Sequence, residues 1–292
     1  MQNVKTISEL LKFSIINLDK PCGPTSFGAD VIVRKILGVE YASHFGTLDP
    51  QCSGVLPISL NRACRLQEYF MHKNKTYVGI MRVHKEISEK EIEEEIKNFL
   101  GKIMQKPPVK SRVKREERER EVFSWKILEI DGKDVLFETE VQAGTYIRKL
   151  VSSLGEKIGG AHMLELRRTK AGIFSEKDSN FINLYELEKA MDEAKEGNEK
   201  QLRKILIPGE EAIKKVLPVV GVNEESLKKL YNGSPIFREL LLEDLRIKEG
   251  EKFAVFCGDV FVGVYVSKRE ENILARPMFV YKSSRLHPTL DF

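Results

Sequence analysis

Asp49 is the side chain whose position in this sequence best suits nucleophilic or acid–base chemistry. It lies in the segment GTLDP (residues 46–50), between an apolar residue and a proline, and GVLP (54–57) follows. Proline has no amide hydrogen and fixes its own φ, so such a loop can hold a carboxylate in one place. An Asp-Pro pair is also a common turn initiator with no further role. On the residues alone, a plain turn is the favoured interpretation, and a reactive carboxylate is the alternative.

Arg148 and Tyr77 are two further side chains that could act together with a carboxylate. Arg148 ends the segment GTYIR (144–148), one turn into a predicted amphipathic helix. A partly buried guanidinium there would need an anionic partner, and Asp49 would serve. Tyr77 lies on a predicted alternating strand, where tyrosine commonly packs its ring in the core. A solvated arginine and a core tyrosine remain the alternative interpretations.

Hydrophobic periodicity and turn residues predict the elements around Asp49. A buried strand at 13–17 leads through the turn KPCGPTS (20–26) into a helix that Ser26 caps and Gly38 ends. A loop rich in Gly, Asp and Pro, residues 43–57, then carries the carboxylate.

Further strands and helices are predicted to carry Tyr77 and Arg148. Residues 75–84 alternate as in a half-buried strand, and the capping box at 88–91 opens a helix that ends at Gly101. Beyond these we predict two strands joined by a hairpin turn, and then a helix with one apolar stripe: 122–130, 134–142 and 145–158.

The predicted secondary structure changes from mostly helices to short strands near Pro218, which suggests a second unit. Residues 184–217 are predicted to be mostly helical. After Pro218 we expect a short helix and three compact strands, with Gly258-Asp259 as the first turn: 223–231, 253–257, 260–266 and 273–281. We therefore predict two domains, 1–218 and 219–292.

The composition is typical of a folded protein rather than a disordered or membrane-spanning one. Hydrophobic residues make up 41% of the 292 residues and charged residues 32%. No apolar run reaches the ~18 residues that a membrane helix needs, so a cytoplasmic location and no membrane partner are expected. The cysteines form no CxxC pair, and we interpret them as reduced, mostly buried thiols rather than disulfides or metal ligands: Cys22, Cys52, Cys64 and Cys257.

Basic residues are in excess only in the first part of the chain. Residues 1–185 carry 30 basic and 25 acidic side chains, whereas residues 186–292 carry 18 basic and 19 acidic ones. A polyanion such as RNA would therefore be expected to bind the first part, although many enzymes without nucleic-acid partners are equally basic.

Six segments occur in the order and at the spacing of the TruB and dyskerin family of pseudouridine synthases. They are KPCGPTS (20–26), GTLDP (46–50), GVLP (54–57), KTY (75–77), GTYIR (144–148) and AHMLELRRT (161–169). Together they cover roughly residues 14–175. One such segment is weak evidence, but six in order are specific. The sequence therefore resembles members of this family.

The resemblance implies a catalytic role for three residues. Asp49 matches the family's essential aspartate, which acts as nucleophile or directs cleavage of the glycosidic bond, and Arg148 matches the arginine that pairs with it. Tyr77 matches the tyrosine that stacks on the flipped base and assists proton transfer. The uracil is detached, turned and rejoined through C5. Nothing is oxidised and nothing leaves, so neither a cofactor nor a metal is implied. Asp49 is expected to stay ionised in a site that excludes water.

The resemblance also implies substrate-binding residues. Leu166 would form an apolar wall of the pocket, and Lys20 would support the tyrosine from behind. His44 matches a histidine that wedges into substrate RNA. Phe45 stands where the family usually has a small residue, and it could intercalate as a wedge or pack on the protein.

The archaeal and eukaryotic dyskerin-like branch resembles the sequence best, through the basic segment 106–115 and the segments at 161–169. The implied fold class is α+β, a pseudouridine synthase fold with a mixed, mainly antiparallel central sheet flanked by helices. A small β-rich domain like the RNA-binding PUA domain would follow. The implied partners are RNA, including tRNA, rRNA and box H/ACA guide RNA, and small H/ACA ribonucleoprotein subunits.

Four functions remain to be weighed. The first is a guide-dependent uridine isomerase and the second a stand-alone synthase acting on the tRNA T-loop. Activity on a bare tRNA transcript would separate them. The third is an RNA-binding scaffold without catalysis, against which the intact set of Asp49, Tyr77 and Arg148 argues. The fourth is a carboxylate hydrolase, which usually needs a second acid.

Overall fold

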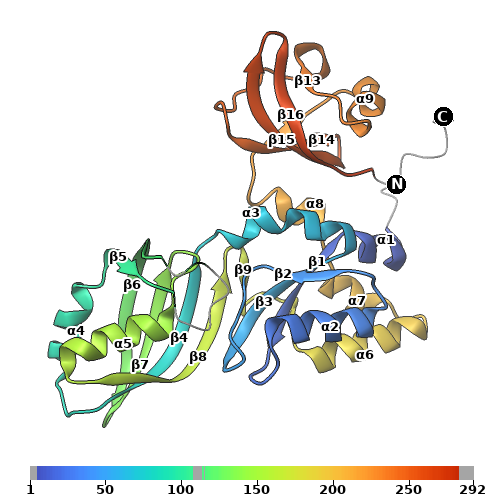
Figure 1. The fold of residues 1–292 in the computed structure, drawn as a ribbon. Helices are drawn as coiled ribbons and strands as arrows, with labels where there is room; N and C mark the ends of the chain where they lie inside the picture. The colour runs from blue at the N-terminus through green and yellow to red at the C-terminus, as the bar shows by residue number, and fades with distance from the viewer. Residues whose placement is uncertain (1–4, 108–113, 115, 283–292) are drawn as a thin grey trace.

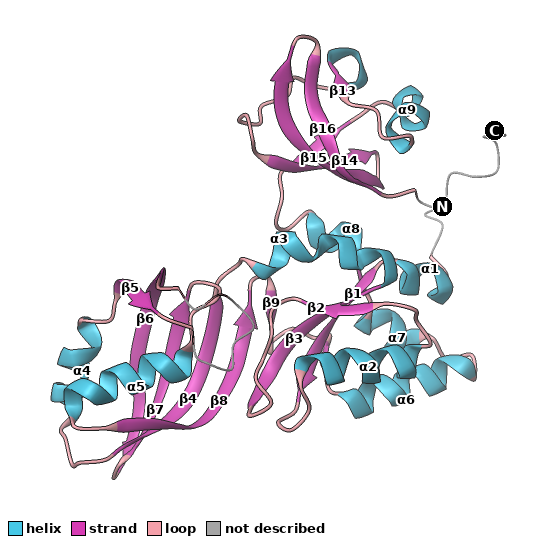
Figure 2. Ribbon diagram, in the orientation of Figure 1, coloured by secondary structure: helices cyan, strands magenta, loops and turns pink. Residues whose placement is uncertain are grey.

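The larger of two sheets carries the candidate residues. The computed structural model describes residues 5–107, 114 and 116–282, and in this part of the chain the larger sheet has 11 strands (Figures 1 and 2). The strands are β1 Ser14–Lys20, β2 Ala42–His44, β3 Cys52–Leu60, β4 Lys75–Val83, β5 Gly101–Gln105, β6 Arg118–Asp131, β7 Asp134–Val141, β8 Ala161–Ala171, β9 Phe174–Ser175, β10 Phe181–Ile182 and β11 Ile207–Pro208. Their main order is β10-β1-β3-β8-β4-β7-β6-β5. Only β1 with β10 and β3 with β8 pair in parallel, so the predicted mixed, mainly antiparallel sheet is confirmed.

Helices flank both halves of this sheet. They are α1 Ile7–Lys12, α2 Ser26–Leu37, α3 Gln67–Met71, α4 Glu89–Lys97, α5 Ile147–Ile158, α6 Leu184–Lys195, α7 Lys200–Ile205 and α8 Gly209–Ile213. In Figure 1, α4 and α5 lie over the half formed by β4 to β8, and α2, α6 and α7 lie beside β1 and β3. Among the described residues, no helix combines the length and apolar character needed to cross a membrane.

Three local predictions about helix and loop ends were wrong. Thr25 rather than Ser26 caps α2, since the Thr25 hydroxyl accepts the Gly28 amide at 2.9 Å. The helix opened by the capping box ends at Lys97, and Gly101 begins β5 with φ +81°. The predicted loop at 43–57 is limited to 45–51, because its first residues belong to β2 and its last residues to β3.

Residues 108–113 and 115 of the basic segment lie outside the described residues.

The second sheet follows the predicted change near Pro218. Its strands are β12 Val219–Gly221, β13 Ile236–Phe237, β14 Lys252–Cys257, β15 Val260–Glu270 and β16 Ile273–Val280, and α9 Leu227–Tyr231 packs beside them. The turn at Gly258-Asp259 joins β14 to β15 as predicted. This β-rich unit lies above the larger sheet in Figure 1.

An aromatic cluster joins the β-rich unit to the larger sheet. Phe13, directly before β1, stacks on Tyr281 with ring centroids 4.0 Å apart and on Phe261 at 5.6 Å. Lys252 of β14 forms an ion pair with Glu68 of α3 at 3.1 Å. Buried apolar surface of this kind is the main stabilising contribution to packing, so the two sheets are held in one orientation.

Candidate active site

The loop that carries Asp49, residues 45–51, is tied down by main-chain hydrogen bonds along its length. The Phe45 amide donates to Pro57 O at 2.9 Å, and the Cys52 amide donates to Asp49 O at 3.0 Å. The Gly23 amide of the KPCGPTS turn donates to Pro50 O at 2.8 Å. The loop is therefore fixed both to β3 and to the turn before α2.

Ser26 is a part of the site that sequence reasoning missed. Its side chain is 1% exposed, and its hydroxyl lies 2.8 Å from both the amide nitrogen and the carbonyl oxygen of Leu48. One hydroxyl can donate to the carbonyl and accept from the amide at the same time. Ser26 thus holds the residue directly before Asp49. The sequence predicts only a helix cap for this serine, because Thr-Ser before an apolar periodic run usually marks a helix start.

Asp49 and Arg148 form an ion pair, as predicted. The Arg148 Nη2 group donates to Asp49 Oδ2, and its Nη1 group donates to Gln51 Oε1 at 3.3 Å. Arg148 lies in the first turn of α5. The side chain of Gln105 fixes this helix start by bonding both the amide nitrogen and the carbonyl oxygen of Tyr146, at 2.9 and 3.3 Å.

The ion pair is open to solvent, contrary to the expectation of a partly buried arginine. The side chain of Arg148 is 48% exposed and that of Asp49 is 46% exposed. An exposed ion pair contributes little to stability. The arrangement therefore orients the carboxylate while leaving it accessible to an incoming substrate.

Tyr77 and Leu166 lie on neighbouring strands next to this loop. Leu166 of β8 pairs with Cys52 of β3 on one side and with Gly79 of β4 on the other, and Tyr77 is two residues from Gly79. Leu166 is buried, and Tyr77 is partly buried against the same core. An added Cβ at Gly79 would lie 3.1 Å from Leu166 Cδ1, so glycine leaves room for this apolar wall.

Lys20 is buried beneath the KPCGPTS turn rather than bonded to Tyr77. Its ammonium group donates to Pro21 O at 2.6 Å and to Pro24 O at 3.0 Å. Burial lowers the pKa of Lys20, while the nearby thiols and the Asp49 carboxylate act in the opposite direction. The residue stabilises the turn that carries the Gly23 contact to the Asp49 loop. The predicted support of the tyrosine stays a prediction.

His44 is fixed by contacts through both ring nitrogens. Nδ1 lies 2.7 Å from Oδ2 of the buried Asp30, and Nε2 lies 3.2 Å from the Thr47 hydroxyl. An RNA contact by this histidine stays a prediction. Phe45 beside it is 2% exposed and stacks on Phe70, with centroids 4.9 Å apart. Of the two alternatives for Phe45, the structure therefore shows packing on the protein.

Two buried cations below the loop, Arg168 and Lys75, were not singled out in the sequence. Arg168 donates to Val55 O at 2.8 Å and to Gly46 O at 3.0 Å. Lys75, 5% exposed, donates to Met71 O at 2.6 Å and to Lys73 O at 2.5 Å. Burial and then the charge of Arg168 lower the pKa of Lys75 to about 7. Lys75 lies in the segment KTY and Arg168 in the segment AHMLELRRT, two of the six segments that resemble the family. This resemblance was the signal in the sequence that could have identified them.

The low pKa of Lys75 predicts a pH-dependent stability. Between about pH 7 and 10, the unfolded chain binds a proton at Lys75 that the folded chain does not, so stability rises with pH in this window. Relative to Lys75→Met, the free energy of unfolding of the wild type should rise by on the order of 1 kcal/mol per pH unit from pH 7 to 9. Denaturant titrations of both proteins measure this.

The control for that measurement is Lys73→Met, which removes an exposed lysine two residues away. The free energy of unfolding of Lys73→Met should differ from that of the wild type by the same amount at every pH. If the difference between Lys75→Met and the wild type were also constant, Lys75 would keep its proton throughout the window.

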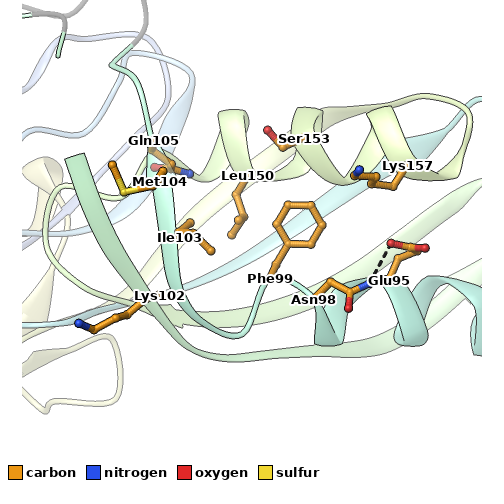
Figure 3. Close-up of a pocket in the computed structure, with 10 residues that line it drawn as sticks. All are labelled: Glu95, Asn98, Phe99, Lys102, Ile103, Met104, Gln105, Leu150, Ser153 and Lys157. Carbon is orange, nitrogen blue, oxygen red and sulfur yellow. Dashed lines mark hydrogen bonds between the residues drawn. The ribbon is translucent and has the colours of Figure 1, made fainter. Parts of the chain in front are cut away.

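A pocket of about 590 Å³ lies elsewhere, between α4, β5 and α5 (Figure 3). Phe99, Ile103 and Leu150 form its apolar part, and Glu95 and Lys157 lie at its polar side. None of the six predicted site residues lines it.

The chain matches known families over most of its length. The TruB family pseudouridylate synthase N-terminal domain matches residues 34–147, and the tRNA pseudouridylate synthase B C-terminal domain matches residues 148–214. The probable tRNA pseudouridine synthase B of Nanoarchaeum equitans is 47% identical over 211 residues, which span 72% of this chain and 60% of that protein. The Methanopyrus kandleri protein of the same name is 40% identical over 255 residues, 86% of this chain and 75% of that protein.

Solved structures match both sheets together. One chain in the crystal structure of a Cbf5-Nop10-Gar1 complex is 36% identical with a TM-score of 0.88, covering 98% of this chain and 90% of that one. A chain of an H/ACA RNP bound to a substrate RNA containing 2′-deoxyuridine is 35% identical with a TM-score of 0.85, covering 95% and 88%. These matches confirm the resemblance drawn from the six segments and the predicted fold class.

Proposed function

Since the chain belongs to the TruB family of pseudouridylate synthases, which are isomerases, we propose that it converts uridine to pseudouridine in folded RNA with Asp49 as the essential carboxylate. The observation that carries the proposal is the accessible Asp49–Arg148 ion pair on a loop that is otherwise fixed by hydrogen bonds. A carboxylate held in this way needs no rearrangement before reaction.

The site residues divide the proposed reaction among them. The target uridine flips out of its stack, and the ring of Tyr77 offers a face on which the uracil stacks, with Leu166 as the apolar wall. Asp49 acts as nucleophile or directs breakage of the C1′–N1 bond, and Arg148 orients it. The detached uracil turns, and C5 bonds to C1′. The proton of C5 is lost and N1 gains one, so the product is an isomer. This balance requires neither redox cofactor nor metal.

The substrate and partners follow from the proteins that match. Relatives named probable tRNA pseudouridine synthase B suggest tRNA as a substrate, and we propose its T-loop uridine as the target. The matching structures contain Nop10, Gar1 and H/ACA substrate RNA, so we propose guide RNA, rRNA and such small subunits as partners. Within this assembly, residues 1–218 would be catalytic and 219–292 would bind RNA through a PUA-like domain. The proposed location is the cytoplasm.

Tritium release from transcripts labelled with [5-³H]uridine tests the proposal, because C5 gives up its hydrogen only when it bonds to C1′. Release from tRNA with the protein alone is the expected result for a stand-alone T-loop synthase. A transcript with cytidine at the target position should release no tritium. If tRNA alone fails, release on adding guide RNA and the small subunits is expected instead. A folded protein that releases tritium under neither condition would be an RNA-binding scaffold, and the proposal would be wrong.

A further inference from the structure

Arg168 is a buried guanidinium whose hydrogen bonds go to main-chain oxygens. It is 1% exposed, and its Nε and Nη2 groups donate to Val55 O and Gly46 O at 2.8 and 3.0 Å. Within the described ranges it forms no ion pair with a carboxylate. Burying an arginine without an acid is costly, and its hydrogen bonds to main-chain oxygens offset part of this cost.

The two acceptors belong to the two sides of the Asp49 loop. Gly46 lies at the start of residues 45–51, and Val55 lies in β3 after its end. One planar guanidinium thus spans the base of the loop. The main chain of Arg168 also lies against β3, the strand after the loop, since an added Cβ at Gly54 would lie 2.2 Å from Arg168 O. Only glycine permits this close approach of β3 and β8.

The neighbouring Arg167 shows what an ordinary structural arginine on this strand does. It forms ion pairs with Asp19 at 3.0 Å and Glu176 at 2.8 Å, and its side chain is 36% exposed. Successive side chains of a strand point to opposite faces, so Arg167 stabilises the other side of the sheet. Arg168 has no such acidic partner among the described residues, and its two hydrogen bonds go to Gly46 in the Asp49 loop and to Val55 in β3.

We propose that Arg168 is a positioning residue for the isomerisation, which fixes the Asp49 carboxylate by holding both sides of its loop from below. The proposal rests on the proposed function. The buried Lys75 reinforces this arrangement, because its Cε would lie 3.8 Å from an added Cβ at Gly46 and so fills the space beside the same backbone. Arg168 acts through the main chain and does not touch the uridine.

The test compares Arg168→Met, Arg168→Lys and the matched control Arg167→Met by tritium release, with kcat, KM and the melting temperature measured for each. Misplacing a reacting group by about 1 Å costs up to roughly a hundredfold in rate, so Arg168→Met should lower kcat by about tenfold to a hundredfold. KM should stay within about twofold, because RNA phosphate contacts dominate binding. Arg168→Lys, which can still donate to one carbonyl, should recover part of the loss.

Arg167→Met should lower the melting temperature yet leave kcat within about twofold of the wild type. A kcat for Arg168→Met equal to that of Arg167→Met would overturn the proposal, and so would a loss that appears only in KM. If Arg168→Met does not fold, Arg168→Lys decides alone: a reduced kcat at unchanged KM supports the proposal, and an unchanged kcat overturns it. Failure of the proposed function is separate, since the wild type itself would then release no tritium.

Discussion

Replacing Asp49 by asparagine is expected to lower the rate of isomerisation by at least about 10⁴-fold, as loss of a nucleophile does in other enzymes. Asparagine keeps the size of the side chain and can still accept a hydrogen bond from Arg148, so the loop should keep its structure. The amide lacks the negative charge that attacks C1′ or steers cleavage of the glycosidic bond. Tritium release under single-turnover conditions measures the loss.

RNA binding by Asp49→Asn should stay within about threefold of the wild type, because contacts to phosphates supply most of the affinity. The matched control is Asp19→Asn, which removes a carboxylate from the Arg167 ion pair. This variant should retain most of its turnover. Turnover by Asp49→Asn within tenfold of the control would exclude Asp49 as the essential carboxylate.

Removing the ring of Tyr77 is expected to have the second largest effect. Stacking of a base on an aromatic side chain contributes about 1–3 kcal/mol, so Tyr77→Ala should slow turnover by roughly tenfold to a hundredfold. Tyr77 lies on β4, two residues from the Gly79 that pairs with Leu166, and its side chain is partly buried against the core. Single-turnover rates at saturating protein separate this effect from weaker RNA binding.

Tyr77→Phe distinguishes the ring from the hydroxyl. A rate near that of the wild type would assign the effect to stacking, and a rate near that of Tyr77→Ala would assign it to proton transfer by the hydroxyl. Tyr185, a highly exposed tyrosine on α6, provides the matched control, and Tyr185→Ala should leave turnover unchanged. Wild-type turnover by Tyr77→Ala would mean that another residue holds the base.

Local signals in the sequence predicted most elements, and the resemblance to the family predicted one contact of the site. The capping box at 88–91 and the turn at Asp131-Gly132 each depend on a few adjacent residues, and the structure has both. The Asp49–Arg148 pairing followed from the resemblance, in which Arg148 matches the arginine that pairs with the family's essential aspartate. These predictions required no knowledge of which strands are neighbours.

The support of the loop could not be predicted in the same way. Ser26 reaches Leu48 and Arg168 reaches Gly46 only because the chain brings together residues 22 and 122 positions apart. The parallel pairing of β3 with β8 creates the second contact, and no periodicity within either strand specifies it. The open state of the ion pair was also missed, since exposure depends on the surrounding loops rather than on residue type.

The stack of Phe13 on Tyr281 has a consequence for synthesis of the chain. The ribosome makes Phe13 first, and its partner follows only after 267 intervening residues have been added. The larger sheet can therefore fold while the face of Phe13 is still uncovered, and the β-rich unit docks last. Loss of this stack would weaken the docking of the two units, which the ion pair between Lys252 and Glu68 also joins. An RNA held by both units would then follow a less fixed path to Asp49.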